Sequence, residues 1–230
     1  MSFGAVDGMR KTTAFILAFA CVPLSAALAQ DEPVAPPVEA VAAEKSQALE
    51  PQAAPPVQPE KPVAPAPLVY ENAQAGIRVT VPAGWRSYRG VRRHPEILTL
   101  FSRLPYESAD TDNPKIVLIR EPAGKKPADS VLAVAYRHAE VVRLMRNLKE
   151  KVANTILLEP PVQDQGRAYA RLAYEITSIG KDKALDIARS REYVFRGNDG
   201  FYVLLCGAPP EVFEKHTADF KAAADSVVIK

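Results

Sequence analysis

The side chains with the clearest chemical potential lie in one basic stretch, residues 85–94, which reads Trp-Arg-Ser-Tyr-Arg-Gly-Val-Arg-Arg-His. Guanidinium groups bind carboxylates and phosphates through paired hydrogen bonds, and aromatic rings supply a flat apolar surface beside them. The stretch therefore indicates a site for an anionic partner surface, with the candidate residues Arg86, Tyr88, Arg89, Arg92 and Arg93. A solvated hairpin anchored in the core by Trp85 accounts for the same residues, and the sequence favours it over a binding site.

The sequence contains no recognisable catalytic constellation. Motifs for a serine nucleophile, a zinc-binding helix, a redox cysteine pair, a phosphate-binding loop and a dinucleotide site are absent from it. The histidines, His94, His138 and His216, have no partner at a metal-ligand spacing. His138 lies on an apolar helix stripe, which favours a hydrogen-bonded core imidazole over a ligand. We expect no catalytic residue, no metal site and no cofactor, and therefore no enzyme.

Two other features have simple structural explanations. The acidic turn at residues 107–113 offers oxygen ligands for calcium, but it lacks the glycine and terminal glutamate of an EF-hand, which favours a hydrophilic loop. Cys206 ends the apolar run of residues 201–206, which favours a buried, inert thiol over a nucleophile or an intermolecular bridge.

The elements that must position these residues are mostly strands. We expect them over residues 68–71, 77–81, 85–89, 97–101, 116–119, 167–177, 185–196 and 201–206. Three of these strands are apolar at consecutive positions, which is typical of strands that are covered on both faces (97–101, 116–119 and 201–206). In the strand at 85–89, Arg86 and Tyr88 would share one face, and Trp85 and Arg89 the other.

Two strands carry charges that constrain their surroundings. Residues 167–177 alternate between apolar and polar side chains, so one face of this strand should meet water. In residues 185–196, Arg189 and Arg191 share a phase with Ile187 and Tyr193. We expect a bulge or an edge position to resolve that conflict.

Two amphipathic helices are predicted beside the strands. The first is capped by Asp129 or Ser130, and its apolar stripe comprises Val131, Val134, His138, Val141, Met145, Leu148 and Val152. The second follows Pro209 and Pro210, and it buries Phe213, Thr217, Phe220, Ala224 and Val227. About eight strands and two helices indicate an α+β fold, with a largely antiparallel central sheet and helices packed on both faces.

The N-terminal residues 1–29 indicate a secretory signal peptide. Arg10 and Lys11 precede the apolar run of residues 14–28, and small residues at 27 and 29 suit a signal peptidase. A retained membrane anchor and lipidation at Cys21 are the alternatives, and the shortness of the run and its poor lipoprotein box argue against them. We expect export to the periplasm or the medium.

Residues 30–67 contain ten prolines and nine alanines, with two lysines against six acidic residues. Such a tract cannot bury enough apolar surface to order itself, so we expect a disordered, partly polyproline linker. The expected globular domain, residues 68–230, has 25 basic and 20 acidic residues. This excess of five charges is too small to indicate a nucleic-acid partner.

Short motifs resemble the PsbP and DcrB-like domain family. Residues 76–85, Gly-Ile-Arg-Val-Thr-Val-Pro-Ala-Gly-Trp, are similar to the opening strand, proline turn and Gly-Trp pair of these domains. Residues 201–205, a helix over 213–224 and the closing residues 225–229 resemble their C-terminal part, in which the last helix leads into a short strand. The resemblance implies a PsbP-like α/β/α sandwich and a mostly non-catalytic binding or assembly role, and it carries over no functional residue.

We therefore expect an exported, non-catalytic binding or accessory module of the cell envelope, held on a Pro-Ala linker. Its expected partner is an envelope protein, and association with a membrane surface stays open. A periplasmic protein that binds a small ligand or an anion is the alternative, and a hydrolase with dispersed catalytic residues is the third hypothesis.

Overall fold

The computed structural model describes residues 66–89, 94–105, 113–122, 130–180 and 182–230. The expected signal peptide, nearly all of the expected linker, Arg92, Arg93 and residues 107–112 of the acidic turn lie outside these ranges. In chain order the elements are β1 (Leu68–Asn72), β2 (Ile77–Val81), β3 (Arg86–Arg89), β4 (Ile97–Ser102), β5 (Lys115–Pro122), α2 (Val131–Leu144), η2 (Met145–Asn147), β6 (Val152–Val162), β7 (Tyr169–Ile179), β8 (Leu185–Arg196), β9 (Gly200–Ala208), α3 (Pro210–Asp225) and β10 (Val228–Ile229).

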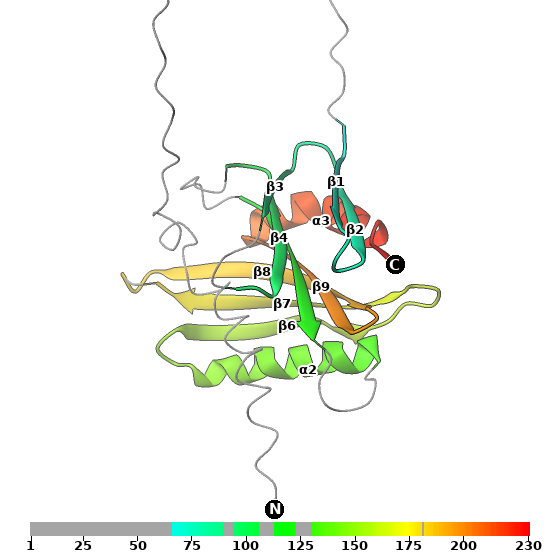
Figure 1. The fold of residues 1–230 in the computed structure, drawn as a ribbon. Coiled ribbons are helices and arrows are strands. Elements are labelled where there is room, and N and C mark those ends of the chain that lie inside the picture. Colours follow the sequence, from blue (N-terminus) through cyan, green and yellow to red (C-terminus); the bar gives the residue numbers. More distant parts are fainter. Residues whose placement is uncertain (1–65, 90–93, 106–112, 123–129, 181) are drawn as a thin grey trace, which may run out of the picture.

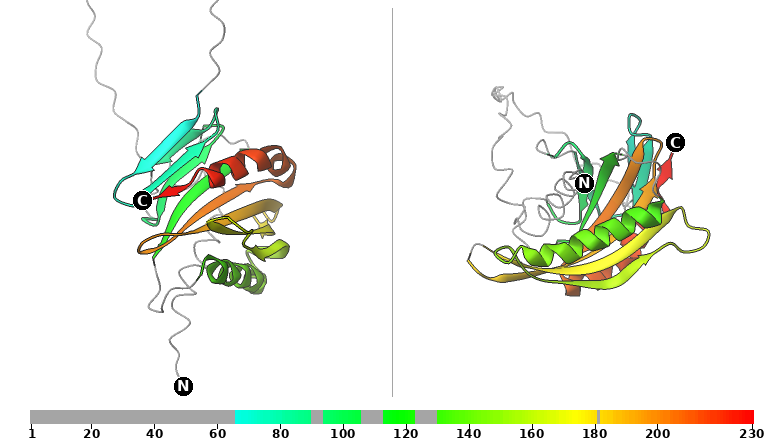
Figure 2. Two further views of the ribbon diagram at one scale, coloured as in Figure 1. Left: turned by 90° about the vertical axis from the view of Figure 1, so that its right-hand side faces the viewer. Right: turned by 90° about the horizontal axis from the view of Figure 1, so that it is seen from below.

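The strands form two antiparallel sheets. The larger sheet has seven strands in the order β3-β4-β5-β9-β8-β7-β6, and the smaller has three in the order β1-β2-β10. Helix α2 packs on β6, β7 and β8 from one side, whereas α3 packs on β8, β9 and the small sheet from the other (Figures 1 and 2). The predicted α+β fold with helices on both faces is confirmed, and the separate small sheet is an addition that the sequence does not predict.

The core has two layers, one on each face of the large sheet. In β5, Val117 and Ile119 face the layer under α2, while Ile116 and Leu118 face the layer under α3. Every residue of β9 is buried. The consecutive apolar positions of these strands therefore reflect cover on both faces, as predicted.

Helix α2 begins where the sequence predicts and ends earlier. The Ser130 hydroxyl accepts a hydrogen bond from the Ala133 amide at 3.1 Å, which caps the helix. The α-helix stops at Leu144, so the extension of the apolar stripe to Leu148 and Val152 as helix is wrong. Both residues still pack against the layer under α2, but Leu148 does so from a turn and Val152 from β6.

Strand β6 is the element that the sequence analysis misses. It lies at one edge of the large sheet and pairs with β7 alone. Its register is interrupted by bulges, and it contains Pro160 and Pro161. Prolines mask a strand pattern because they cannot donate to a ladder, yet an edge strand tolerates them on its open side.

Helix α3 begins at Pro210 and covers the second face. Phe213, Phe220 and Ala224 are buried as predicted, whereas Thr217 and Val227 are only partly buried, and Val227 lies beyond the end of the helix. The strand that the family resemblance implies after this helix is present as β10, which pairs with β2. No helix in the described ranges is long and apolar enough to cross a membrane.

Candidate functional site

The predicted basic site falls on β3, the edge strand opposite β6. The Arg86 side chain is exposed, and Tyr88 is half-buried against the layer under α2. Trp85 is 5 % exposed and belongs to the opposite layer, so the predicted division between two faces is confirmed for Trp85 and Tyr88. The side chain of Arg89 and all of Arg92 and Arg93 lie outside what the structure describes.

The structure adds Arg103 to this region. Ser102 is the cross-strand partner of Arg86, so Arg103 follows one position later and points to the opposite face of the sheet, where Asp219 and His216 of α3 contact it. The Arg103 side chain is 38 % exposed. We call Arg86 and Arg103 the basic corner. A side chain at Gly84 would place its Cβ 2.9 Å from Arg103 Nη2, and Gly84 has a φ of +89°. Glycine therefore suits this turn for two reasons, its left-handed conformation and the space it leaves for the guanidinium group.

Asp219 of α3 ties the basic corner to the core. Its Oδ2 accepts hydrogen bonds from Trp85 Nε1 at 3.2 Å and from Arg103 Nη1 at 3.4 Å, and it lies 3.2 Å from His216 Nδ1. The Trp85 and His216 rings meet edge to face. No sequence signal connects Asp219 to Trp85, because the two residues are 134 positions apart.

A second polar cluster is buried between α2 and the large sheet. His138 Nδ1 lies 2.6 Å from Glu192 Oε2, and His138 Nε2 lies 2.9 Å from Glu121 Oε2. The hydroxyl of Tyr174 donates to the other oxygen of Glu192 at 2.7 Å. The side chains of His138 and Glu192 are 6 % and 3 % exposed. The prediction of a hydrogen-bonded core imidazole at His138 is confirmed.

This cluster holds a proton firmly. Burial by itself lowers the pKa of His138, but the carboxylates of Glu192 and Glu121 outweigh burial and raise it to about 10. Burial, and then the Glu192 carboxylate, raises the pKa of the Tyr174 hydroxyl well above its usual value. Because carboxylates only accept hydrogen bonds, both imidazole nitrogens donate, and neither can take a proton from a substrate. The cluster is suited to fastening α2 to the sheet, and poorly suited to acid-base catalysis.

The charged state of His138 predicts a dependence of stability on pH. The folded pKa of about 10 exceeds the ordinary value of 6.5, so the stabilisation is complete below pH 6.5 and disappears as the pH rises towards 10. We expect the urea midpoint of the wild type to fall more steeply between pH 7 and 10 than that of His138→Leu. Equal slopes in the two proteins would show that His138 is neutral in the folded state.

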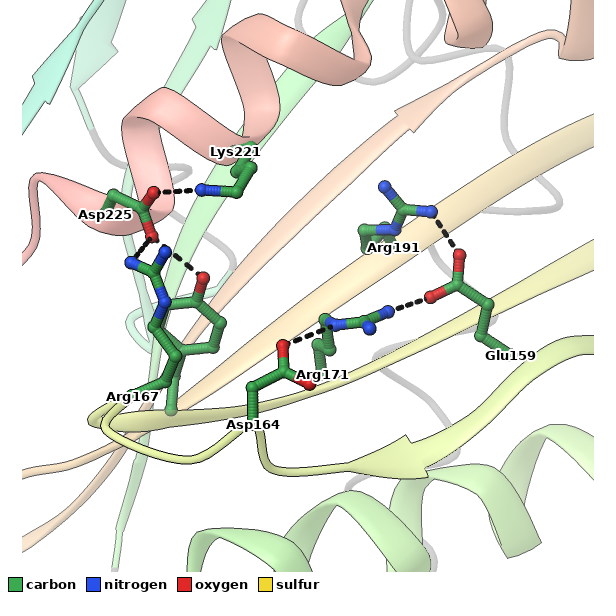
Figure 3. A network of polar contacts seen from close by, with 8 residues as sticks. Glu159, Asp164, Arg167, Arg171, Arg191, Lys221 and Asp225 are labelled. Carbon is green, nitrogen blue, oxygen red and sulfur yellow. Dashed lines mark hydrogen bonds and ion pairs between the residues drawn. The ribbon is translucent and has the colours of Figure 1, made fainter.

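The face of the large sheet beside α3 carries a set of ion pairs (Figure 3). Glu159 bridges Arg171 and Arg191, and Arg171 also contacts Asp164. At the end of α3, Asp225 accepts hydrogen bonds from Arg167, Tyr169 and Lys221. Burial, followed by Asp225, raises the pKa of Tyr169 to about 12.

These contacts correct the expectation for β8. Its register with β7 and β9 is continuous, so the predicted bulge or edge position is wrong. Arg189 pairs with Glu175 and Glu214, and Arg191 pairs with Glu159, so an inner strand accommodates both charges. On β7, Glu175 and Arg171 are partly exposed, as expected for a face that meets water, but Tyr169 on that face is buried. Because its arginines are balanced by carboxylates, this face is not an anion site.

A depression of about 460 Å³ lies between the β1–β2 turn, the β8–β9 turn and the end of β10. Its charged side chains are already paired, Arg120 with Asp199 and Lys230 with Glu71. The Tyr202 hydroxyl donates to the Ala75 carbonyl across it. Because these charged side chains and the Tyr202 hydroxyl already bind other groups of the protein, the depression is a weak candidate for a small-ligand site.

Other predicted features are also located. Cys206 is a free, fully buried cysteine, and burial raises the pKa of its thiol, so the prediction of a buried thiol is confirmed. His94 Nδ1 lies 3.2 Å from Glu96 Oε1. Within the described ranges, no group of three or more His, Cys, Asp or Glu side chains could hold a metal ion.

No family model matches the sequence, and no curated protein matches it. Among solved structures, the PsbP protein of the cyanobacterium Synechocystis sp. PCC 6803 is similar with a TM-score of 0.44 and 12 % identity, over 73 % of this chain and 94 % of that chain. LpqN of Mycobacterium tuberculosis, a protein involved in cell envelope biogenesis, is similar with a TM-score of 0.44 and 15 % identity, over 72 % of this chain and 91 % of that chain. Protein PA94 of Pseudomonas aeruginosa has a TM-score of 0.39 and 13 % identity, over 71 % and 97 %.

The neighbours thus include a PsbP protein, and the DcrB-like part of the expected resemblance has no specific support among them. Similarity below a TM-score of 0.5 carries no argument about function. The function is therefore argued from the residues of this chain.

Proposed function

We propose that the protein is an exported accessory module of the cell envelope that binds an anionic surface of a partner protein and catalyses no reaction. The exposed side chain of Arg86 carries this proposal. Arg86 is exposed on an edge strand, so its guanidinium group is presented to solvent on a rigid part of the fold, whereas Arg103 pairs with Asp219 on the opposite face of the sheet. Arginine on a rigid scaffold recognises carboxylates with defined geometry.

The absence of catalysis is supported by the state of the histidines. Both ring nitrogens of His138 are engaged with carboxylates, and the Nδ1 atoms of His94 and His216 lie beside Glu96 and Asp219. Export is supported by the sequence of residues 1–29, and the following Pro-Ala tract would let the domain reach away from its point of attachment.

The experiment is affinity capture from an envelope extract with the full chain as bait. We expect one protein to be retained at near-equal stoichiometry and to be released by salt. A variant in which Arg86, Arg89, Arg92 and Arg93 are replaced by serine should lose that capture, because it removes four positive charges from one region. A matched control replaces four exposed basic residues elsewhere with serine (Arg137, Arg143, Lys149 and Lys151).

Capture that both variants retain would contradict the proposed surface. If the bait retains no protein and citrate or phosphate raises the melting temperature of the chain, the alternative of a small-anion-binding protein would be favoured. The four-serine variant should then also lose the thermal shift if the same arginines form the site.

A further inference from the structure

The two edge strands of the large sheet differ in how many of their outward backbone groups are already hydrogen-bonded. An edge strand presents unpaired N–H and C=O groups on its outer side, which can accept a strand from another chain. The edges here are β3 and β6. Strand addition is a common way for proteins to bind extended peptides, because backbone hydrogen bonds supply affinity and side chains supply specificity.

Side chains of the protein itself close the β6 edge. The Asn154 side chain accepts a hydrogen bond from the Thr155 amide at 2.9 Å. The Thr155 carbonyl accepts from Arg146, at 3.1 Å from Nε and 2.5 Å from Nη2. Farther along the strand, Pro160 and Pro161 have no N–H to offer. The outer side of β6 is therefore a poor acceptor for another strand.

On β3, Ser87 has no such cap on its backbone among the contacts between the described residues. Two hydrogen bonds join β3 to Thr99 of β4: Ser87 Oγ lies 3.0 Å from Thr99 Oγ1, which donates to the Tyr88 carbonyl at 3.2 Å. The Tyr88 carbonyl thus faces β4. Because successive backbone groups alternate along a strand, the N–H and C=O of Ser87 face away from β4.

The neighbouring small sheet does not extend β3. Strand β1 pairs with β2 and lies over a face of the large sheet, where the Tyr70 hydroxyl donates to the Leu98 carbonyl at 3.2 Å. The Tyr70 and Phe101 rings meet edge to face in the same region. The outer side of β3 is therefore not paired by β1, and Ser87 itself is exposed.

Charge specifies what could pair there. The exposed Arg86 side chain lies at this edge, and residues directly opposite in neighbouring strands interact through their side chains. An acidic side chain on an incoming strand would be the favourable partner of Arg86. We propose that an extended, acidic segment of the partner protein adds to β3 as a further strand of the large sheet. This inference rests on the proposed function, and it specifies which part of the partner protein binds and in what conformation.

The test uses the full chain and a blocked peptide of alternating glutamate and valine, with a lysine-valine peptide for comparison. We expect the acidic peptide to bind and the basic peptide not to bind. In the complex, hydrogen exchange of the Ser87 amide, followed by NMR, should slow, because this N–H would donate to the peptide backbone. Binding that leaves exchange at Ser87 unchanged would overturn strand addition, and so would equal binding of both peptides.

Two substitutions at one position separate the backbone from the side chain. Ser87→Pro removes the outer N–H and should weaken binding of the acidic peptide about fivefold to tenfold, the effect of one lost hydrogen bond. Ser87→Ala removes only the hydroxyl and should bind like the wild type. Proline is tolerated at an edge position whose N–H faces solvent, and the exchange measurement on the wild type does not depend on the variant.

A third substitution distinguishes this inference from the proposed function. Arg86→Ser should weaken binding of the acidic peptide, whereas Arg78→Ser, at an exposed arginine of β2, should not. If Arg86→Ser weakens binding and Ser87→Pro does not, recognition of an anionic surface stands and strand addition is overturned. Arginine-dependent binding of phosphatidylglycerol vesicles without binding of the acidic peptide would overturn the inference in favour of a lipid surface.

Discussion

Replacing His138 by leucine is expected to reduce the free energy of unfolding by about 3 to 5 kcal/mol, the usual cost of breaking a buried ion pair by removing one partner. Leucine preserves most of the apolar packing of the helix face, but it leaves the Glu192 carboxylate without its cationic partner. That carboxylate is 3 % exposed, so water cannot replace the lost contact. Urea unfolding at pH 7, monitored by circular dichroism, measures the loss.

A double variant tests whether the loss comes from the charge. His138→Leu combined with Glu192→Met removes both members of the pair, and it should recover most of the stability, because an apolar pair of similar volume can replace a buried ion pair. The double variant also leaves the Tyr174 hydroxyl without its acceptor. Tyr174→Phe loses the same hydrogen bond, so as a matched control it measures that part of the loss of stability. A double variant as unstable as His138→Leu alone would contradict the role assigned to the ion pair.

Replacing Phe220 by alanine is expected to reduce the free energy of unfolding by about 3 to 5 kcal/mol, through lost burial and the cavity that remains. Phe220 is fully buried, and its ring centroid lies 5.1 Å from that of Phe213 and 6.1 Å from that of Trp85. The Phe220 side chain therefore links α3 to Trp85, which directly precedes β3. Trp85 is the single tryptophan, so its fluorescence should also change.

A conservative substitution gives the control for this prediction. Phe220→Leu keeps part of the buried volume and should cost less stability than Phe220→Ala. If Phe220→Ala leaves both the urea midpoint and the Trp85 emission unchanged, α3 does not pack on the sheet through this residue. If only the stability falls, the turn before β3 keeps its structure independently of α3.

The two largest effects lie on opposite faces of the large sheet, and both concern how a helix is fastened to it. Helix α2 is fastened by a buried imidazolium between carboxylates, and α3 by an aromatic cluster. The His138 ring nitrogens are engaged with carboxylates, and Phe213 and Phe220 are apolar, so neither set of contacts is suited to catalysis. For this reason we propose that the function lies at the β3 edge of the sheet, where Arg86 and Ser87 are exposed.

The sequence by itself determines the parts of this fold that follow from local pattern. The spacing of apolar residues identifies both helices, and it offers Asp129 or Ser130 as the cap of the first, of which Ser130 is the one that accepts the Ala133 amide. Apolar side chains at consecutive positions of β5 and β9 predict cover on both faces, since each strand alternates between two core layers. The buried state of Cys206 follows from the same run. These features depend on neighbours along the chain, and periodicity records such neighbours directly.

Tertiary structure alone decides the features that depend on distant partners. Glu192 lies 54 positions from His138, and Asp219 lies 134 positions from Trp85. The inner position of β8 is possible because carboxylates from β6, β7 and α3 neutralise its arginines. Strand β6 is set by pairing with β7 and not by its own proline-containing pattern. Such contacts form only when the chain closes long loops, and a single sequence carries no local signal of which residues will then meet.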